Sequence, residues 1–180
     1  EDYKEFGQKC GIPIKTANYS SEDGTFNSDN EYLTIINTAR VKRMDLLEYY
    51  DSRKNILDIE RSTLFLLAEE LQKFKKEKGL KDFTDLLEDF IEKSLPGSLE
   101  VLFIDEAQDL SLIQWEMVRH LWKYAKKTYI AGDDDQAIFK WAGADVDHFI
   151  ALKEEVNDIK VLDQSYRIPG GPIHELSQKI

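Results

Sequence analysis

Apolar positions along the chain follow different patterns in its two halves. In the first half they recur at helical spacing over three stretches, residues 31–50, 58–78 and 82–95. Gly79 fits the end of the second stretch, and Pro96 ends the third because proline cannot continue a helix. The first 30 residues predict a short helix or turn followed by an irregular polar loop. The first half is therefore expected to be mostly helical.

After Pro96, short apolar runs alternate with helical stretches. Five of the six residues from Leu99 to Ile104 are apolar, which is typical of a strand buried on both faces of a parallel sheet. Further strands are predicted at 128–131 and 159–162, and helices at 111–126 and 145–155. Strands that alternate with helices indicate a parallel sheet with right-handed crossovers, and hence the α/β class.

Acidic and amide side chains follow the predicted strands at the point where each strand ends. After the three strands come, in order, Asp105, Glu106 and Asp109; then Asp133, Asp134, Asp135 and Gln136; then Gln164, Tyr166 and Arg167. The carboxyl ends of parallel strands meet at one edge of a sheet, so these groups should converge on one cleft. A lone acidic pair could equally begin a helix, where carboxylates suit the helix dipole. Three convergent ends instead favour Mg²⁺ with a bound polyphosphate.

Composition limits the classes of protein that fit. With 180 residues, 42% of them hydrophobic, the chain can form one domain, or a domain with a smaller insertion. A single cysteine, Cys10, agrees with a reducing compartment. No apolar run approaches the roughly 18 residues of a membrane span, so a cytoplasmic location without membrane contact is expected. The net charge of -11 argues against binding nucleic acid by bulk charge but leaves a narrow groove possible.

One candidate phosphate-binding loop fails on its glycines. The segment GIPIKT, residues 11–16, ends in Lys-Thr, but Ile14 stands where a P-loop has its second glycine. Without that glycine the backbone amides cannot wrap a phosphate. The chain also begins with Glu1 rather than Met and stops within a helix-like pattern. We therefore expect a portion of a longer protein, with no P-loop within residues 1–180.

Four segments resemble, in the same order, motifs of superfamily 1 DNA helicases of the UvrD/Rep type. They are DFTDLLEDF, then LFIDEAQD (Walker B, motif II), IAGDDDQAIFKWAGA (motif III) and VLDQSYR (motif IV). The resemblance implies a partial RecA-like P-loop NTPase sheet with a mostly helical inserted subdomain. Residues 1–80 would be the inserted 1B-like subdomain, and residues 81–180 the C-terminal part of the first RecA-like domain, 1A.

The resemblance also implies roles for single residues in ATP hydrolysis, a reaction that the chain is not expected to perform by itself because it lacks the P-loop lysine. Asp105 would hold Mg²⁺ together with Glu106, and Glu106 would also act as general base on the attacking water. Gln136 would sense the γ-phosphate, Arg167 would be an arginine finger, and Tyr166 would stack on the adenine. Asp109 and Asp133 are expected to orient loops rather than touch the metal.

The implied partner is single-stranded or partly duplex DNA, with movement from 3′ to 5′. Phe139 and Trp141 would stack on bases, a contact that tolerates any sequence. The family usually has Arg where this chain has Ala142, and Lys140 could compensate for that arginine. Core packing remains the alternative interpretation for both aromatic residues, and it is favoured for Trp115 and Trp122.

Two other functions remain open from the residues alone. A metal-dependent nuclease or phosphatase would use the acidic strand ends as a two-metal site, but it gives Gln136, Trp141 and Arg167 no role. A non-catalytic nucleic-acid-binding module would have no need of Asp105 and Glu106. DNA cleavage without ATP would favour the nuclease.

Overall fold

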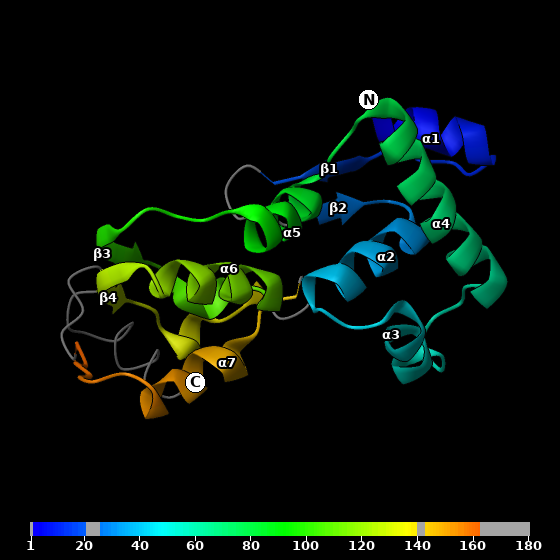
Figure 1. Cartoon of the computed structure of the whole chain (residues 1–180). Coiled ribbons are helices and arrows are strands. Elements are labelled where there is room, and N and C mark those ends of the chain that lie inside the picture. The colour runs from blue at the N-terminus through cyan, green and yellow to red at the C-terminus, as the bar shows by residue number, and fades with distance from the viewer. Residues whose placement is uncertain (1, 21–25, 140–142, 163–180) are drawn as a thin grey trace. The chain divides into compact units, whose positions relative to one another are not determined.

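A computed structural model describes residues 2–20, 26–139 and 143–162 of the chain. Two compact units are distinguished, residues 1–150 and residues 151–180. The helices and strands, shown in Figure 1, are α1 (Asp2–Cys10), β1 (Ala17–Tyr19), β2 (Phe26–Ser28), α2 (Glu31–Val41), α3 (Leu46–Arg53), α4 (Arg61–Lys78), α5 (Phe83–Lys93), β3 (Leu99–Ile104), α6 (Leu112–Trp122), β4 (Ala125–Ile130) and α7 (Val146–Ala151). Short 3₁₀ turns cover Ala107–Asp109, Asp134–Gln136 and Leu152–Glu154. A helical first half followed by a parallel strand pair confirms the α/β expectation.

The single helix predicted over residues 31–50 is wrong, because two helices, α2 and α3, occupy this stretch. Arg43 lies between them with φ at 52°, a left-handed conformation that ends a helix. The side chain of Asp45 then begins α3 by accepting hydrogen bonds from the backbone N–H groups of Leu47 and Glu48. Arg43 is also ion-paired with Glu116 of α6, at 2.9 Å.

Part of the predicted polar loop is instead a short antiparallel hairpin. Strand β1 pairs with β2 so that Tyr19 lies opposite Phe26. The two rings are 5.0 Å apart, and Phe26 is buried. The carboxylate of Asp29 accepts hydrogen bonds from the backbone N–H groups of Lys15 and Thr16. Such pairing depends on contacts across the chain, which a run of polar residues does not reveal.

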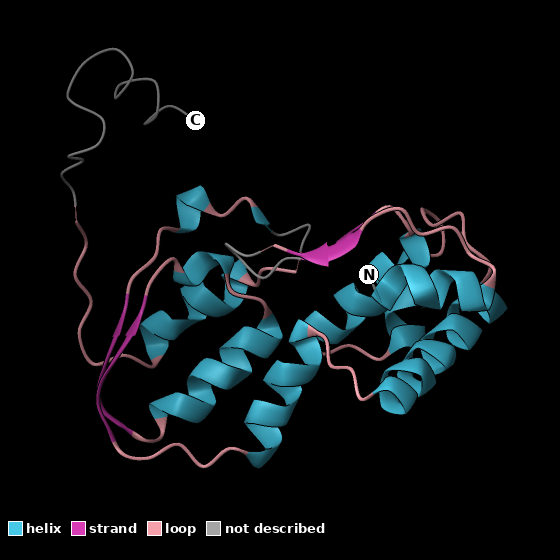
Figure 2. Cartoon of the chain, turned by 90° about the horizontal axis from the view of Figure 1, so that it is seen from above, coloured by secondary structure: helices cyan, strands magenta, loops and turns pink. Residues whose placement is uncertain are grey.

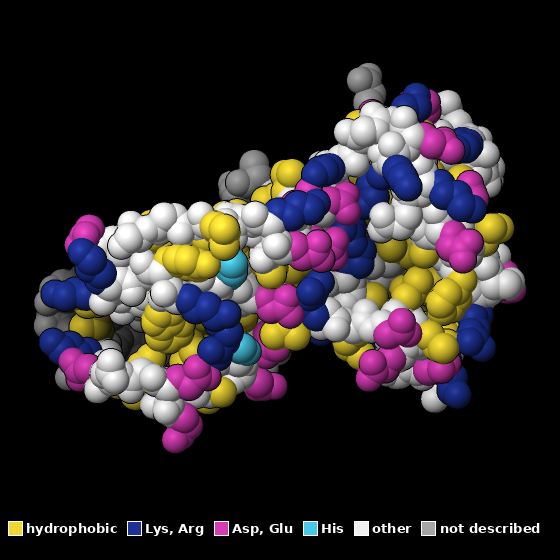
Figure 3. All heavy atoms as spheres, in the orientation of Figure 1, with side chains coloured by type: hydrophobic (Ala, Val, Ile, Leu, Met, Phe, Trp, Pro, Cys, Tyr) yellow, Lys and Arg dark blue, Asp and Glu magenta, His cyan; other side chains and the backbone are white. Residues whose placement is uncertain are grey.

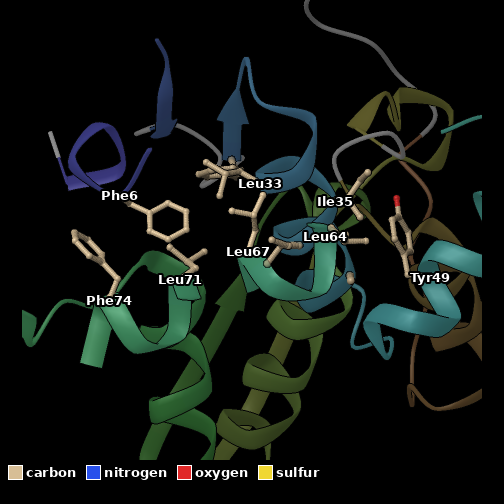
Figure 4. Packing of buried hydrophobic residues seen from close by; sticks show 11 residues of the cluster. Phe6, Leu33, Ile35, Tyr49, Leu64, Leu67, Leu71 and Phe74 are labelled. Atoms are coloured by element: carbon tan, nitrogen blue, oxygen red, sulfur yellow. The ribbon is translucent and has the colours of Figure 1, made fainter. Parts of the chain in front are cut away.

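The hydrophobic core of the first half lies between α1, α2, α3 and α4. Figure 4 shows its side chains: Phe6, Leu33, Ile35, Tyr49, Leu64, Leu67, Leu71 and Phe74 are all buried. The predicted apolar face of residues 58–78 is therefore the face of α4 that packs into the core. The rings of Phe6 and Phe74 lie 5.7 Å apart and join α1 to α4.

Strands β3 and β4 form a parallel pair in the second half. Their register places Leu99 opposite Ala125 and Ile104 opposite Ile130. Because the ladder with β3 extends that far, β4 begins at Ala125 rather than at the predicted residue 128, and α6 ends at Trp122. The indole of Trp115 on α6 is completely buried, which confirms its predicted core position.

One face of this strand pair is open, so the prediction that the first strand is buried on both faces is wrong for the described residues. Phe103 is 73% exposed, and its ring stacks on that of Tyr129 at 5.1 Å. Helices α5 and α6 lie on the same side of the pair (Figure 2). Burial of the other face requires a second covering layer, which a strand's own sequence cannot supply.

The prediction of a strand at 159–162 is also wrong, because these residues form no strand. Leu162 is 90% exposed and Val161 is 84% exposed. An apolar run becomes a strand only where a neighbouring strand supplies hydrogen-bond partners for its backbone. In the described part of the chain, β3 and β4 pair only with each other.

Candidate functional site

The ends of β3 and β4 bring two of the predicted acidic segments together. The backbone N–H of Ala131 donates to the carbonyl of Ile104 at 2.8 Å, and that of Ala107 donates to the carbonyl of Ala131 at 3.0 Å. The chain leaving β3 is thus held against the chain leaving β4. This contact confirms the expected convergence for the first two strand ends. The third group, Gln164, Tyr166 and Arg167, lies outside the described residues.

Asp105 and Glu106 are the first residues after β3, and both side chains are exposed. Glu106 has φ 49° and ψ 42°, a left-handed conformation that costs a non-glycine residue on the order of 1 kcal/mol. Its backbone N–H donates to Oδ1 of Asp105 at 3.0 Å. The sharp turn directs the two neighbouring carboxylates away from the strand and toward solvent at the sheet edge.

Gln108 is a residue of this site that the sequence analysis did not single out. Its side chain is only 1% exposed. The amide nitrogen Nε2 donates to Oε2 of Glu106 at 2.8 Å, and the amide oxygen Oε1 accepts the backbone N–H of Asp133 at 2.9 Å. Gln108 is an uncharged polar residue among several carboxylates, so nothing in the sequence indicated that its side chain is buried. The signal that could have identified it is its position, two residues after Glu106.

Asp133 organises the acidic turn that follows β4. Its Oδ1 accepts the backbone N–H of Asp135 at 3.1 Å, and its Oδ2 accepts a hydrogen bond from Nε2 of Gln136 at 2.5 Å. Gln136 itself is exposed at the end of the 3₁₀ turn Asp134–Gln136. These contacts support the expectation that Asp133 orients a loop, and they leave Gln136 at the surface near the Glu106 loop.

The donor set at the sheet edge suits Mg²⁺ better than a metal that needs a complete protein cage. Among the residues that the structure describes, no three His, Cys, Asp or Glu side chains gather to hold a metal ion. Mg²⁺ keeps several waters and is usually held by one or two carboxylates together with substrate phosphates. Exposed Asp105, with Glu106 beside it, fits that limited role.

Residues 144 and 145, which follow the predicted DNA-binding residues, pair with the two residues directly after the Walker B segment. Ser111 and Ala144 form an isolated antiparallel bridge, and the backbone N–H of Asp145 donates to the carbonyl of Leu110 at 2.9 Å. Phe139 is half-buried, and its carbonyl accepts the backbone N–H of Ala144 at 3.2 Å. Lys140 and Trp141 lie outside the described residues, so their predicted roles stay predictions.

The basic residues of α4 and the following loop mostly face carboxylates. Lys73 pairs with Glu70, Lys78 with Glu5, and Lys81 with Asp89, while buried Lys75 pairs with Asp82 and Asp85. On the face seen in Figure 3, Lys and Arg side chains are mixed with Asp and Glu side chains rather than gathered in one basic area. Since carboxylates already neutralise these four lysines, this surface is not a ready site for nucleic-acid phosphates.

No helix within the described ranges is both long enough and apolar enough to cross a membrane.

Comparison with known proteins identifies several relatives of this chain. The chain is 33% identical over 82 residues to ATP-dependent DNA helicase Rep of Escherichia coli (strain K12), which covers 44% of this chain and 12% of that protein. It is 32% identical over 130 residues to RecBCD enzyme subunit RecB of Buchnera aphidicola, an alignment that covers 64% of this chain and 11% of that protein. It is 27% identical over 128 residues to ATP-dependent DNA helicase PcrA of Staphylococcus epidermidis, an alignment that covers 65% of this chain and 18% of that protein.

These alignments span less than a fifth of each of the three relatives. A broader match extends over residues 8–157, which correspond to the UvrD/REP helicase N-terminal domain. This range includes the DFTDLLEDF segment, the Walker B segment and the motif III segment. Together with the two joined acidic strand ends, it shows that the chain belongs to the UvrD/Rep helicase family.

Proposed function

We propose that the chain is part of an ATP-dependent DNA helicase that moves along single-stranded DNA from 3′ to 5′. The observation that carries this proposal is the hydrogen-bonded junction between the Glu106 loop and the Asp133–Gln136 turn. A motor of this kind needs a hydrolytic base and a phosphate sensor in one site. Family membership adds ATP as the nucleotide, and Rep and PcrA are both named ATP-dependent DNA helicases.

In the proposed site, each described side chain has a separate task. Asp105 would hold Mg²⁺, which when bound supplies positive charge against the phosphate oxygens. Glu106 would accept a proton from the attacking water, and Gln136 would donate a hydrogen bond to the terminal phosphate. Tyr166 and Arg167 would complete the nucleotide site by stacking on adenine and by neutralising charge on the γ-phosphate. The P-loop that such a site requires is not among residues 1–180.

The proposed DNA contacts lie on the loop that follows Gln136. Phe139, Lys140 and Trp141 come within five residues of the proposed phosphate sensor. Stacking of aromatic rings on bases would give sequence-independent binding to single strands. Phosphate sensing and base stacking on one short loop would couple ATP hydrolysis to movement on DNA.

We also propose that residues 1–80 are the inserted 1B-like subdomain and that residues 81–180 belong to the first RecA-like domain. The core of α1 to α4 supports the first assignment, and the parallel strands with α6 support the second. The cytoplasm remains the predicted location.

The test is DNA-stimulated ATP hydrolysis by the full-length polypeptide that contains this chain. Wild type is compared with Glu106→Gln and with the control Glu100→Gln. Glu100 is an exposed carboxylate on β3 that pairs with Lys126, away from the strand end. We expect single-stranded DNA to stimulate turnover in wild type and Glu100→Gln. Turnover should be lost in Glu106→Gln, while DNA binding measured by fluorescence anisotropy is retained.

The nuclease alternative makes the opposite prediction in the same samples. It requires metal-dependent loss of intact DNA without nucleotide, with no ATP turnover. That result would overturn the helicase proposal.

A further inference from the structure

We infer that Gln108 is a positioning residue that holds the proposed base, Glu106, in a fixed geometry relative to the proposed phosphate sensor, Gln136. The inference rests on the proposed function and deepens it. Gln108 does not reach the nucleotide, because its side chain is buried between the two loops. Its action would instead pass through the residues that it contacts.

The first step is the use of both ends of the Gln108 amide. Nε2 donates to Oε2 of Glu106 at 2.8 Å, while Oε1 accepts the backbone N–H of Asp133 at 2.9 Å. A hydrogen bond to one carboxylate oxygen fixes the plane of the carboxylate, while the second oxygen can still accept a proton. Only a side chain that is both donor and acceptor can make these two contacts at once, which explains an amide at this position.

The second step continues the connection to the sensor. Oδ2 of Asp133 accepts a hydrogen bond from Nε2 of Gln136 at 2.5 Å. The end of β3 is thus connected to the end of β4 through a series of contacts from Glu106 to Gln108, Asp133 and Gln136. Asp133 takes part with its backbone N–H on one side and its carboxylate on the other. A shift of Gln136 on binding a phosphate would therefore be transmitted to the plane of the Glu106 carboxylate.

The third step is the tight space around the amide. A Cβ at Gly132 would lie 2.7 Å from Oε1 of Gln108 and 2.8 Å from the ring of Phe149. The backbone of Gly132 therefore closes against the side chain and limits its rotation. Burial without room to rotate makes Gln108 suited to fixing geometry, since a misplacement of about 1 Å in an active site can cost about 100-fold in rate.

The experiment uses full-length protein and compares wild type with Gln108→Met. Methionine keeps the side-chain length and removes the hydrogen bonds to Glu106 and Asp133, together with a longer one from Nε2 to Oδ2 of Asp109 at 3.4 Å. Thr84→Val is the matched control. Thr84 is completely buried and hydrogen-bonded to Asn37 at 3.1 Å, and it lies on α5 outside the site. The measurements are kcat and KM for ATP with saturating single-stranded DNA, the affinity for DNA, and thermal unfolding. We expect Gln108→Met to lower kcat by about 10- to 100-fold, with KM and DNA affinity nearly unchanged. Thr84→Val should lower the unfolding temperature without lowering kcat.

A double-mutant cycle with Gln136→Ala separates linkage from a merely structural role. If Gln108 acts by joining the two loops, the double variant loses little more than the worse single variant. If the two residues act independently, their losses multiply, and the inference is overturned. If Gln108→Met does not fold, Gln108→Asn is used instead, because its shorter side chain cannot span both partners.

The outcomes distinguish this inference from the proposed function. Turnover that depends on Glu106 but is unaffected by Gln108→Met overturns the inference and leaves the proposed function standing. Turnover that survives Glu106→Gln overturns both.

Discussion

Arg40 and Asp85 are 45 residues apart in the sequence, yet Nη2 of Arg40 lies 2.5 Å from Oδ1 of Asp85. The same guanidinium reaches Asp82 and Glu88, each at 2.9 Å, and Lys75 contacts Asp82 and Asp85 from α4. We call these five residues the Arg40 cluster. Because Asp82 and Asp85 also form the capping box of α5, the cluster fixes the start of that helix against α2 and α4.

Removing the central cation should destabilise the protein strongly. In Arg40→Met the three carboxylates lose their shared partner, and breaking such a largely buried network costs about 3 to 5 kcal/mol. The free energy of unfolding is measured by urea denaturation. The control is Lys73→Met, which removes an exposed pair with Glu70 and should change stability little. Equal effects of the two substitutions would contradict a special role for the cluster.

Acid should weaken the same cluster through Asp82. Burial by itself raises the pKa of Asp82, but the charges of Arg40 and Lys75 outweigh it and hold this pKa below the ordinary value of 3.8. The stabilisation is therefore complete above pH 3.8 and is lost as pH falls through the lower folded-state pKa. Urea midpoints measured downward from pH 7 should fall less steeply in Asp82→Asn than in wild type. Identical slopes would show that Asp82 is not responsible.

Alkali should act on Tyr19, the partly buried tyrosine of β1. Burial, followed by the charge of Asp82, raises the pKa of Tyr19 to about 12 from 10.0. The folded state holds this proton more tightly than the unfolded state, so stability falls between pH 10 and about 12. In Tyr19→Phe this part of the decline should be absent. The check is a comparison of urea midpoints over that range, with tyrosinate absorbance reporting ionisation directly.

We expect a side chain at position 132 to destabilise the protein, because neighbouring side chains leave no room for one. In Gly132→Ala the added methyl would meet Gln108 and Phe149 at under 3 Å, and overpacking of this kind costs about 1 to 3 kcal/mol. Gly97→Ala is the control, because nothing lies within 4 Å of a Cβ there. Thermal unfolding should separate the two variants clearly. A Gly132→Ala protein as stable as wild type would mean that Phe149 moves aside without cost.

The local features of the fold could be predicted because each depends on neighbouring residues. The apolar spacing of α4 located its core face, and Gly79, with φ at 64°, ends that helix as expected. The alternation after Pro96 predicted the parallel pairing of β3 with β4. The limits of elements were less predictable, since the left-handed Arg43 between α2 and α3 has an ion-pair partner, Glu116, that lies 73 positions away.

For the candidate site, the sequence by itself determined which chemical groups are present and their order. The positions of Asp105, Glu106 and Gln136 after the ends of β3 and β4 could be predicted, because strand patterns and family motifs depend on consecutive residues. Only the tertiary structure decided that Gln108 is buried and hydrogen-bonded to both Glu106 and Asp133, and that one face of the strand pair is open. The physical reason is that burial and hydrogen bonding depend on which distant backbone comes within about 3 Å of a side chain. That proximity is settled by packing of the whole unit rather than by any local pattern.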